Sequence, residues 1–99
     1  MKKLLLTLAL LAGPASVYGY KEAHLERLLT IHECKNCDLS GANLKDAQLE
    51  GANLTRAILK EAILREAWLE GAKLTGAILK RAFLWRATLT GADLSGADL

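Results

Sequence analysis

Several arrangements that enzymes depend on are missing from this 99-residue chain. It has no HExxH motif, no glycine-rich phosphate loop, and no Ser/His or Cys/His pair with an orienting carboxylate. Metalloproteases, nucleotide-using enzymes and nucleophilic enzymes need these groups at defined spacings. The acidic residues are spread along the chain instead of being gathered. The sequence therefore predicts no enzyme activity, no catalytic residue and no cofactor.

A long apolar run is also missing. The run Leu4–Ala12 is shorter than the ~20 residues that a membrane-spanning helix needs. It follows Lys2 and Lys3 and precedes Pro14 and small residues, which is typical of a secretory signal peptide. We predict a signal peptide over residues 1–19, with an uncleaved anchor as the alternative. Because no cysteine follows the apolar run, we expect no lipid anchor and no stable membrane anchor after cleavage.

Net charge of one sign is absent once the leader is removed. The whole chain has 13 Lys and Arg against 11 Asp and Glu, and two of the lysines lie in the predicted leader. The remaining charges balance, which gives no electrostatic footprint for nucleic acid. We expect an exported protein in the periplasm, the thylakoid lumen or an equivalent compartment, without a nucleic-acid partner.

What the chain does contain is a five-residue unit repeated from Cys37 to Leu99. Leucine recurs at every fifth position from Leu39, and alanine stands two residues before it from Ala42. An α-helix would spread these leucines around all its sides, because a step of five residues advances about 140°. A straight strand would send alternate leucines to opposite faces. The leucines can share one interior only if the chain turns a corner in every unit.

The number of sides follows from comparing the variable positions at different shifts. A shift of 20 residues over positions 49–88 matches five of the twelve variable positions, whereas a shift of 15 matches one. Four sides are therefore favoured over three. On these units the chain resembles the pentapeptide-repeat family, with Ile, Trp, Phe or Lys often replacing the family's Asp or Asn before leucine. The resemblance implies an all-β solenoid, a right-handed four-sided (quadrilateral) β-helix of about three coils over residues 34–99.

Residues 20–33 precede the repeat and have a different period. Leu25, Leu28, Leu29 and His32 follow the spacing of one helical face. A helix this short is marginal in water unless its apolar face is covered. The open end of the first coil is the nearest surface that can cover it, so we predict a short α-helix over residues 20–33 that caps the N-terminal end of the solenoid.

Two cysteines lie between this helix and the repeat. Cys34 falls in the leucine phase and Cys37 in the alanine phase, so both are expected to face the interior. In an exported chain a disulfide between them is the leading interpretation, and family members with a similar C-x-x-C-D-L segment imply the same.

Buried free thiols, a redox centre and a zinc site are the alternatives to a disulfide. A zinc site would use Cys34, Cys37 and His32 with His24, but these histidines lack the usual paired spacing. A thioredoxin-like centre needs a neighbouring βαβ pattern, and haem attachment needs His where Asp38 stands. We therefore predict no metal site.

The residue before each leucine should point outward, and these residues differ between sides. Two adjacent sides are apolar in their middle, and large side chains gather around the corners that follow. Scattered apolar surface residues are normal. Clustering of this kind is more typical of an interaction surface. The predicted patch consists of Ile58, Ile63, Trp68, Ile78, Phe83 and Trp85.

The sequence ends without residues for a C-terminal cap, which leaves an edge at Leu94, Ala97 and Leu99. An unpaired strand edge favours association, so we predict homodimerisation through the last coil. We therefore interpret the chain as a non-enzymatic exported scaffold or protein-interaction module with an unidentified protein partner. The alternative is a redox-responsive or metal-binding periplasmic protein centred on Cys34 and Cys37.

Overall fold

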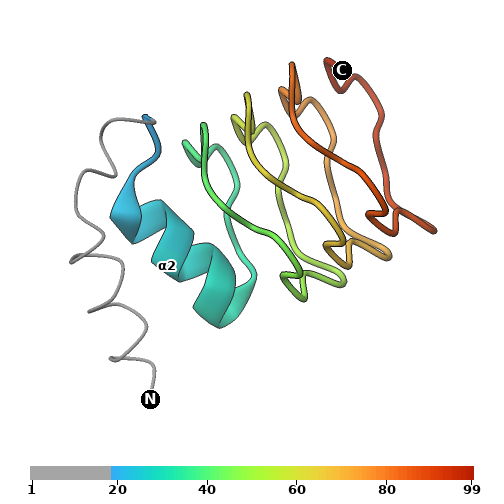
Figure 1. Ribbon diagram of the computed structural model, residues 1–99, viewed down its shortest axis with the longest axis horizontal. Coiled ribbons are helices and arrows are strands. Elements are labelled where there is room, and N and C mark those ends of the chain that lie inside the picture. Colours follow the sequence, from blue (N-terminus) through green and yellow to red (C-terminus); the bar gives the residue numbers. More distant parts are fainter. Residues whose placement is uncertain (1–18) are drawn as a thin grey trace.

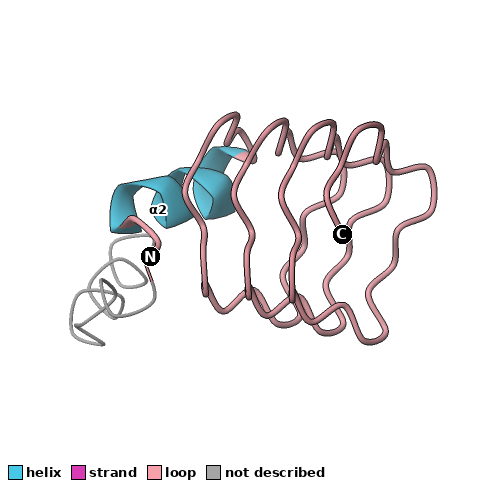
Figure 2. Cartoon of the chain, turned by 90° about the horizontal axis from the view of Figure 1, so that it is seen from above, coloured by secondary structure: helices cyan, strands magenta, loops and turns pink. Residues whose placement is uncertain are grey.

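The computed structural model describes residues 19–99, so the predicted leader lies outside the described residues except for Gly19. One helix, α2 (Glu22–Ile31), lies against the first of a series of stacked coils, and the C-terminus lies at the far end of the stack (Figure 1). Seen from above, the successive coils run side by side away from α2 (Figure 2). The molecule is a solenoid with a helix at its N-terminal end.

The coils are built from very short sides separated by corners. A two-residue turn recurs every five residues from Lys35 onward, and only three residues lie between one turn and the next. Every parallel bridge in the coils joins residues twenty apart, as in Asp38 with Ile58 and Ile58 with Ile78. Four turns therefore complete one coil, which confirms the register inferred from the shift of 20. Among residues 19–99 no strand extends beyond a single bridge residue, because each side is so short.

Backbone hydrogen bonds hold each coil to the next. The Leu39 amide donates to the Ile58 carbonyl at 2.8 Å, and the Ile58 amide donates to the Cys37 carbonyl at 2.8 Å. At the corners the Gly41 amide donates to the Lys60 carbonyl at 2.9 Å. The same pattern repeats along the stack, so the buried backbone groups of these short sides are paired without long strands.

The core consists of the repeated leucines and alanines. In the first two coils after α2 nearly every one of them is buried, and no polar or charged side chain is buried among the described residues. Small alanines alternate with leucines, which lets facing sides approach closely and fill the interior. The largest fully buried side chains are Leu28, Leu39, Leu44, Leu49, Leu54, Leu59, Leu64, Leu69 and Leu74, together with Cys34 and Cys37.

The corners place their second residue in the left-handed backbone region. Glycine occupies this position at Gly51 (φ +70°), but Glu61 (φ +60°) and Arg81 (φ +58°) adopt it as well. A side chain there costs some conformational energy, which the surrounding ladder of hydrogen bonds offsets. Side chains before the corner help to hold the turn: the Ser95 amide and hydroxyl both donate to the Asp93 carboxylate. These hydrogen bonds, with that of the Ser95 hydroxyl the strongest cause, lower the pKa of Asp93.

Helix α2 is shorter at both ends than the predicted segment 20–33. Lys21 is extended before the first helical turn, and His32 lies in the left-handed region (φ +57°), where its amide donates to the Leu28 carbonyl. This backbone hydrogen bond to the residue four positions earlier ends the helix at Ile31, so His32 lies just outside it. No helix among the described residues is long and apolar enough to cross a membrane.

The helix packs on the end of the first coil. Leu28 is fully buried, and Leu25 and Leu29 pack against the same core. Polar contacts fix the position of the helix start: the Asp38 amide donates to His24 Nδ1 at 2.8 Å, and the Lys21 amide donates to the Asp38 carbonyl at 3.1 Å. The apolar face and the first turn of α2 therefore both contact the coil.

The two leucines Leu69 and Leu89 share one column but differ in burial, which provides a matched test of the core. Leu69 is fully buried, whereas Leu89 is only partly buried in the last coil. We expect Leu69→Ala to lower the free energy of unfolding by about 2–5 kcal/mol. Leu89→Ala should cost about half as much or less, because part of its side chain already contacts water. Urea titration followed by circular dichroism measures both; equal losses would contradict the described packing.

Candidate functional site

The predicted patch residues all lie on the outer surface, but they differ in exposure. Trp68, Phe83 and Trp85 expose 47%, 56% and 57% of their surface, whereas Ile58, Ile63 and Ile78 are half-buried. The bridges pair Ile63 with Phe83 on one side and Ile58 with Ile78 on the preceding side. Trp68 lies on the following side, where its bridge partners are Gln48 and Thr88. The strongly exposed part of the patch is therefore its three aromatic residues.

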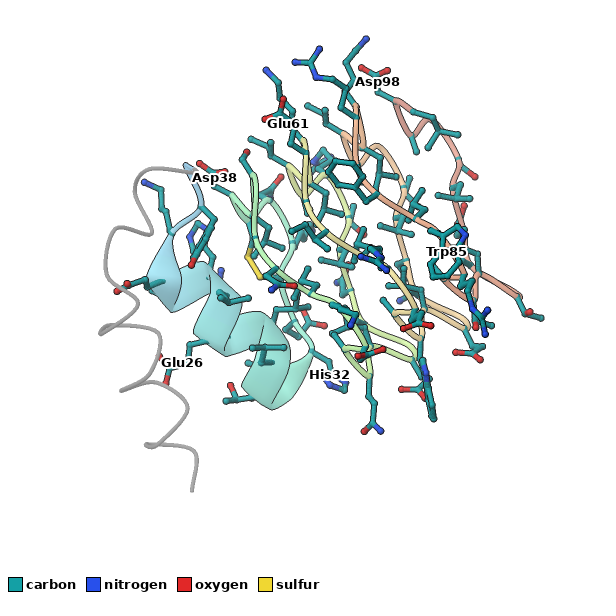
Figure 3. The ribbon with its side chains drawn as sticks, in the orientation of Figure 1. Glu26, His32, Asp38, Glu61, Trp85 and Asp98 are labelled. Atoms are coloured by element: carbon teal, nitrogen blue, oxygen red, sulfur yellow. A yellow bond between two sulfur atoms is a disulfide. The ribbon has the colours of Figure 1, made fainter. Side chains whose placement is uncertain are left out.

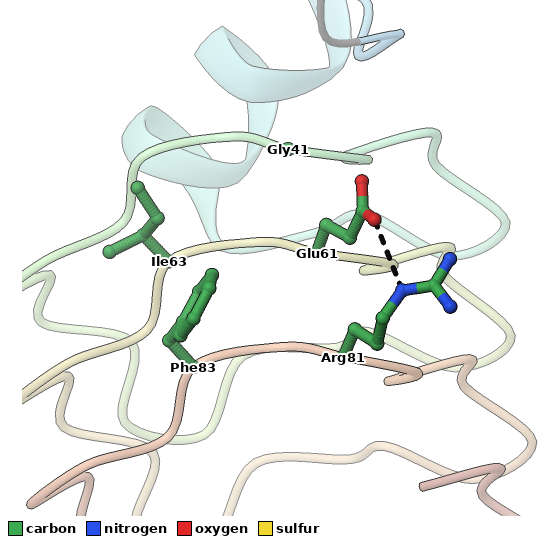
Figure 4. Close-up of a pocket in the computed structure, with 5 residues that line it drawn as sticks. All are labelled: Gly41, Glu61, Ile63, Arg81 and Phe83. Carbon is green, nitrogen blue, oxygen red and sulfur yellow. Dashed lines mark hydrogen bonds and ion pairs between the residues drawn. The ribbon is translucent and has the colours of Figure 1, made fainter.

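A shallow depression lies beside the Ile63 and Phe83 pair. Gly41, Glu61 and Arg81 complete its lining, and its volume is about 310 Å³. Gly41 has no side chain to fill the space, and the Phe83 ring stands beside Ile63 (Figure 4). Arg81 Nε donates to Glu61 Oε2 at 3.1 Å, while its two terminal nitrogens point away from that carboxylate (Figure 4). The lining of the depression thus combines two apolar side chains with the paired Arg81 guanidinium and Glu61 carboxylate.

Two arginines accompany Trp85 at the next corner. The guanidinium carbons of Arg65 and Arg86 lie 5.3 Å and 5.1 Å from the centre of the Trp85 ring, within the range of cation–π contact. Arg86 also pairs with Glu66 at 3.5 Å. Sequence reasoning missed the contact of these arginines with the Trp85 ring, although Arg65 stands twenty residues before Trp85 and the register places the two in one column.

Charge pairs between coils follow the expected register. Glu61 pairs with Arg81 at 3.1 Å and Glu66 with Arg86 at 3.5 Å, as the twenty-residue spacing predicts. All four side chains are substantially exposed, so each pair contributes at most about 1 kcal/mol. These ion pairs are consistent with the twenty-residue register of the coils, but they contribute little to stability.

The last coil exposes core positions. Leu94 and Ala97 are partly buried, and Leu99 exposes 72% of its surface. Among the described residues the Leu84, Leu89 and Leu94 amides have no backbone acceptor, whereas the equivalent amides one coil earlier donate to the next coil. In this 99-residue chain the edge therefore presents both apolar side chains and unpaired backbone donors.

The two cysteines lie between α2 and the first coil. Their sulfur atoms are 2.17 Å apart, a disulfide bonding distance, and both residues are fully buried. The sulfur pair appears in yellow beside α2 in Figure 3. Arg27 places a terminal nitrogen 3.3 Å from Cys37 Sγ, so the helix covers the sulfurs. Within residues 19–99 no group of three or more His, Cys, Asp or Glu side chains is arranged to hold a metal ion.

One further large apolar residue is exposed, and the sequence analysis did not include it in the predicted patch. Ile31, the last residue of α2, is largely exposed. It lines a second depression of about 300 Å³ with Arg27, Glu33 and Lys35. Ile31 falls outside the Leu25, Leu28 and Leu29 stripe, and this offset is the signal that identifies it as a surface residue.

Comparison with protein families gives one match to the described repeat. The model for pentapeptide repeats matches residues 37–76 and 69–99, with eight copies. This match covers the coils and begins at the second cysteine. Comparison with curated proteins gave no match.

Solved structures of pentapeptide repeat proteins are similar to this chain. Rfr23 from the cyanobacterium Cyanothece 51142 is 37% identical over 67% of this chain, with a TM-score of 0.65. HetL, involved in heterocyst differentiation regulation in the cyanobacterium Nostoc sp. strain PCC 7120, is 40% identical over 68% of this chain, with a TM-score of 0.42. The protein alr5209 from Nostoc PCC 7120 is 34% identical over 67% of this chain, with a TM-score of 0.39.

This chain spans only part of each of these proteins. It covers 46% of Rfr23, 34% of HetL and 63% of alr5209. Pentapeptide repeat proteins adopt a right-handed quadrilateral β-helix, and the similarity to Rfr23 supports that fold for this chain. The twenty-residue register of the bridges agrees with a quadrilateral coil.

The state of Cys34 and Cys37 can be measured directly. If the sulfurs are bonded, the denatured but unreduced protein should not react with iodoacetamide, and two alkylations should appear after reduction. Mass spectrometry of protein recovered from an oxidising compartment gives the count. A Cys34→Ala/Cys37→Ala variant serves as the unlabelled control. Two alkylated thiols before any reductant would exclude the disulfide.

Proposed function

Because the chain belongs to the pentapeptide-repeat family, we propose that it is a non-enzymatic, exported scaffold or protein-interaction module. The family has no known enzymatic role. In this proposal residues 1–19 are a signal peptide, α2 caps the N-terminal end, and about three coils over residues 34–99 present the binding surface. The predicted compartment is the periplasm or its equivalent.

The observation that carries this proposal is the exposure of Phe83, Trp85 and Trp68 on the outer surface of a regular solenoid. Aromatic side chains left in water cost free energy, and aromatic residues are enriched at protein interfaces. The sides beneath them are held by hydrogen bonds in every coil, so the aromatic residues project from a rigid support. Little ordering is then required on binding, which favours affinity for a partner.

A second contact surface is proposed at the edge formed by Leu94, Ala97 and Leu99. Its partly exposed apolar residues and unpaired amides suit a second copy of the same edge, which supplies both apolar contact and backbone partners. A two-fold arrangement of two such edges closes the assembly as a dimer. This surface lies at the opposite end of the stack from α2 (Figure 1).

The redox or metal alternative is not favoured. Cys34 and Cys37 are fully buried beneath α2, and a redox partner would have no access to them while the helix is docked. The family relationship also points to no such activity.

Polar substitution of the patch tests the partner proposal. We expect Ile63→Thr/Phe83→Thr/Trp85→Gln to abolish association with the partner, because it removes most of the exposed apolar area. The thermal midpoint should change by only a few degrees, since none of these side chains belongs to the core. Crosslinking and pull-down from the native compartment measure association.

The matched control for the patch is Lys73→Thr/Asp93→Asn, which changes outward positions on the opposite side of the solenoid. It should leave association unchanged. Partner recovery that is equal for the patch variant and the wild type would remove the patch from consideration.

Self-association at the last coil is tested separately. We expect Leu94→Asp/Leu99→Asp to convert a dimer into a monomer, because two charged groups would face each other across the edge. Light scattering at increasing protein concentration measures the mass, and Trp68→Gln, away from the edge, is the control. A wild-type protein that stays monomeric at high concentration contradicts the dimer.

A further inference from the structure

The side that carries Ile63 and Phe83 is flanked by an excess of positive charge. We call it the Ile63–Phe83 side and include its two corners, at residues 40–41, 60–61 and 80–81 and at residues 45–46, 65–66 and 85–86. Three acidic residues lie on these corners, Asp46, Glu61 and Glu66. Six cations, all exposed, lie on the same corners: Lys45, Lys60, Arg65, Lys80, Arg81 and Arg86.

The opposite side of the coil does not share this excess. It carries the outward residues 33, 53, 73 and 93 with their corners, and there the acidic residues outnumber the basic ones by one. The positive excess is therefore a property of one side and not of the whole column. A local excess of one sign attracts groups of the other sign and orients them on approach.

The ion pairs on this side leave cationic groups available. Arg81 contacts Glu61 through Nε, and its terminal nitrogens lie on the side of the guanidinium away from Glu61, Ile63 and Phe83 (Figure 4). Among the described residues Lys60 and Arg65 have no acidic partner within 4 Å. A guanidinium with two free terminal nitrogens can bind a carboxylate through two hydrogen bonds.

We infer that the Ile63–Phe83 side binds an acidic segment of a partner protein, with one apolar side chain of that segment in the depression beside Phe83. The depression of about 310 Å³ is large enough for such a side chain, and Ile63 and Phe83 supply its apolar contacts. Acidic residues on either side of the anchor would then meet Arg81 and Lys60 at one corner and Arg65 at the other. This inference rests on the proposed interaction function and specifies the chemistry of the partner.

A protein segment fits this side better than other anionic ligands do. A phosphate backbone would satisfy the cations but has no apolar group for the floor of the depression. A bilayer surface would cover the exposed aromatic residues but would not use the space above Gly41. An apolar anchor with neighbouring carboxylates uses both features of the side at once.

Selection from a random peptide library is the test. Displayed peptides about twelve residues long are selected on the immobilised protein and in parallel on Ile63→Ser/Phe83→Ser. We expect peptides that bind the wild type and not the variant to carry Asp or Glu close to a large apolar residue. Circular dichroism establishes that the variant is folded. The most enriched peptide is then synthesised and titrated into the protein. The change in the protein's tryptophan fluorescence gives the affinity for the wild type and for each variant.

The charge dependence is measured with single variants. Arg81→Gln should weaken the selected peptide about fivefold, the effect of one exposed charge-assisted contact. Lys73→Gln, on the opposite side, should leave the affinity unchanged. Raising the salt from about 50 to about 200 mM should weaken binding to the wild type, and less so to Arg81→Gln.

The outcomes separate this inference from the proposed function. Patch-dependent peptides without acidic enrichment would overturn the acidic partner and leave the interaction module standing. The absence of any patch-dependent peptide, together with unchanged partner recovery in the patch variant, would overturn both. Binding of anionic lipid vesicles or of a single-stranded oligonucleotide at Phe83, with no selected peptide, would also overturn the acidic partner.

Discussion

Parallel backbone hydrogen bonds between residues about twenty apart are the interaction on which the whole column depends. Each side has only three residues between corners, so it cannot form a strand of its own and is held by the coils before and after it. The leucine and alanine of each unit face inward because this ladder fixes the position of every corner. Stability is therefore shared between neighbouring coils, and α2 packs against the end of the first coil through Leu25, Leu28 and Leu29.

The division of each unit into inward and outward positions separates folding from function. Leu59 and Ala57 are fully buried and specify the fold, while Ile58 between them lies at the surface. The outward positions are constrained mainly by the corner and by the residue twenty places away. Any function resides in these positions, and membership of the family does not specify it.

The sequence was sufficient to predict the repeat and its register, because a single spacing carries both. The inward leucines, the buried cysteine positions and the Glu61–Arg81 pair all follow from that spacing. The ends of α2 did not follow, because a histidine occupies the left-handed position at residue 32 where glycine is the usual signal. The half-burial of Ile58 and Ile78 also needed the structure, since it depends on how closely adjacent coils pack. The stacking of Arg65 on Trp85 depends on side-chain rotamers that spacing leaves undetermined.

The twenty-residue coil has a consequence for how such a chain can change length. Duplicating a segment of twenty residues within the stack would add one coil and return every later side chain to the side it already occupies. An insertion of five residues between Arg65 and Phe83 would keep all leucines inside, but every later residue would move to the next side of the solenoid. Phe83 and Trp85 would then no longer stack above Ile63 and Arg65. Insertions that the core tolerates equally well would therefore differ sharply in their effect on the surface.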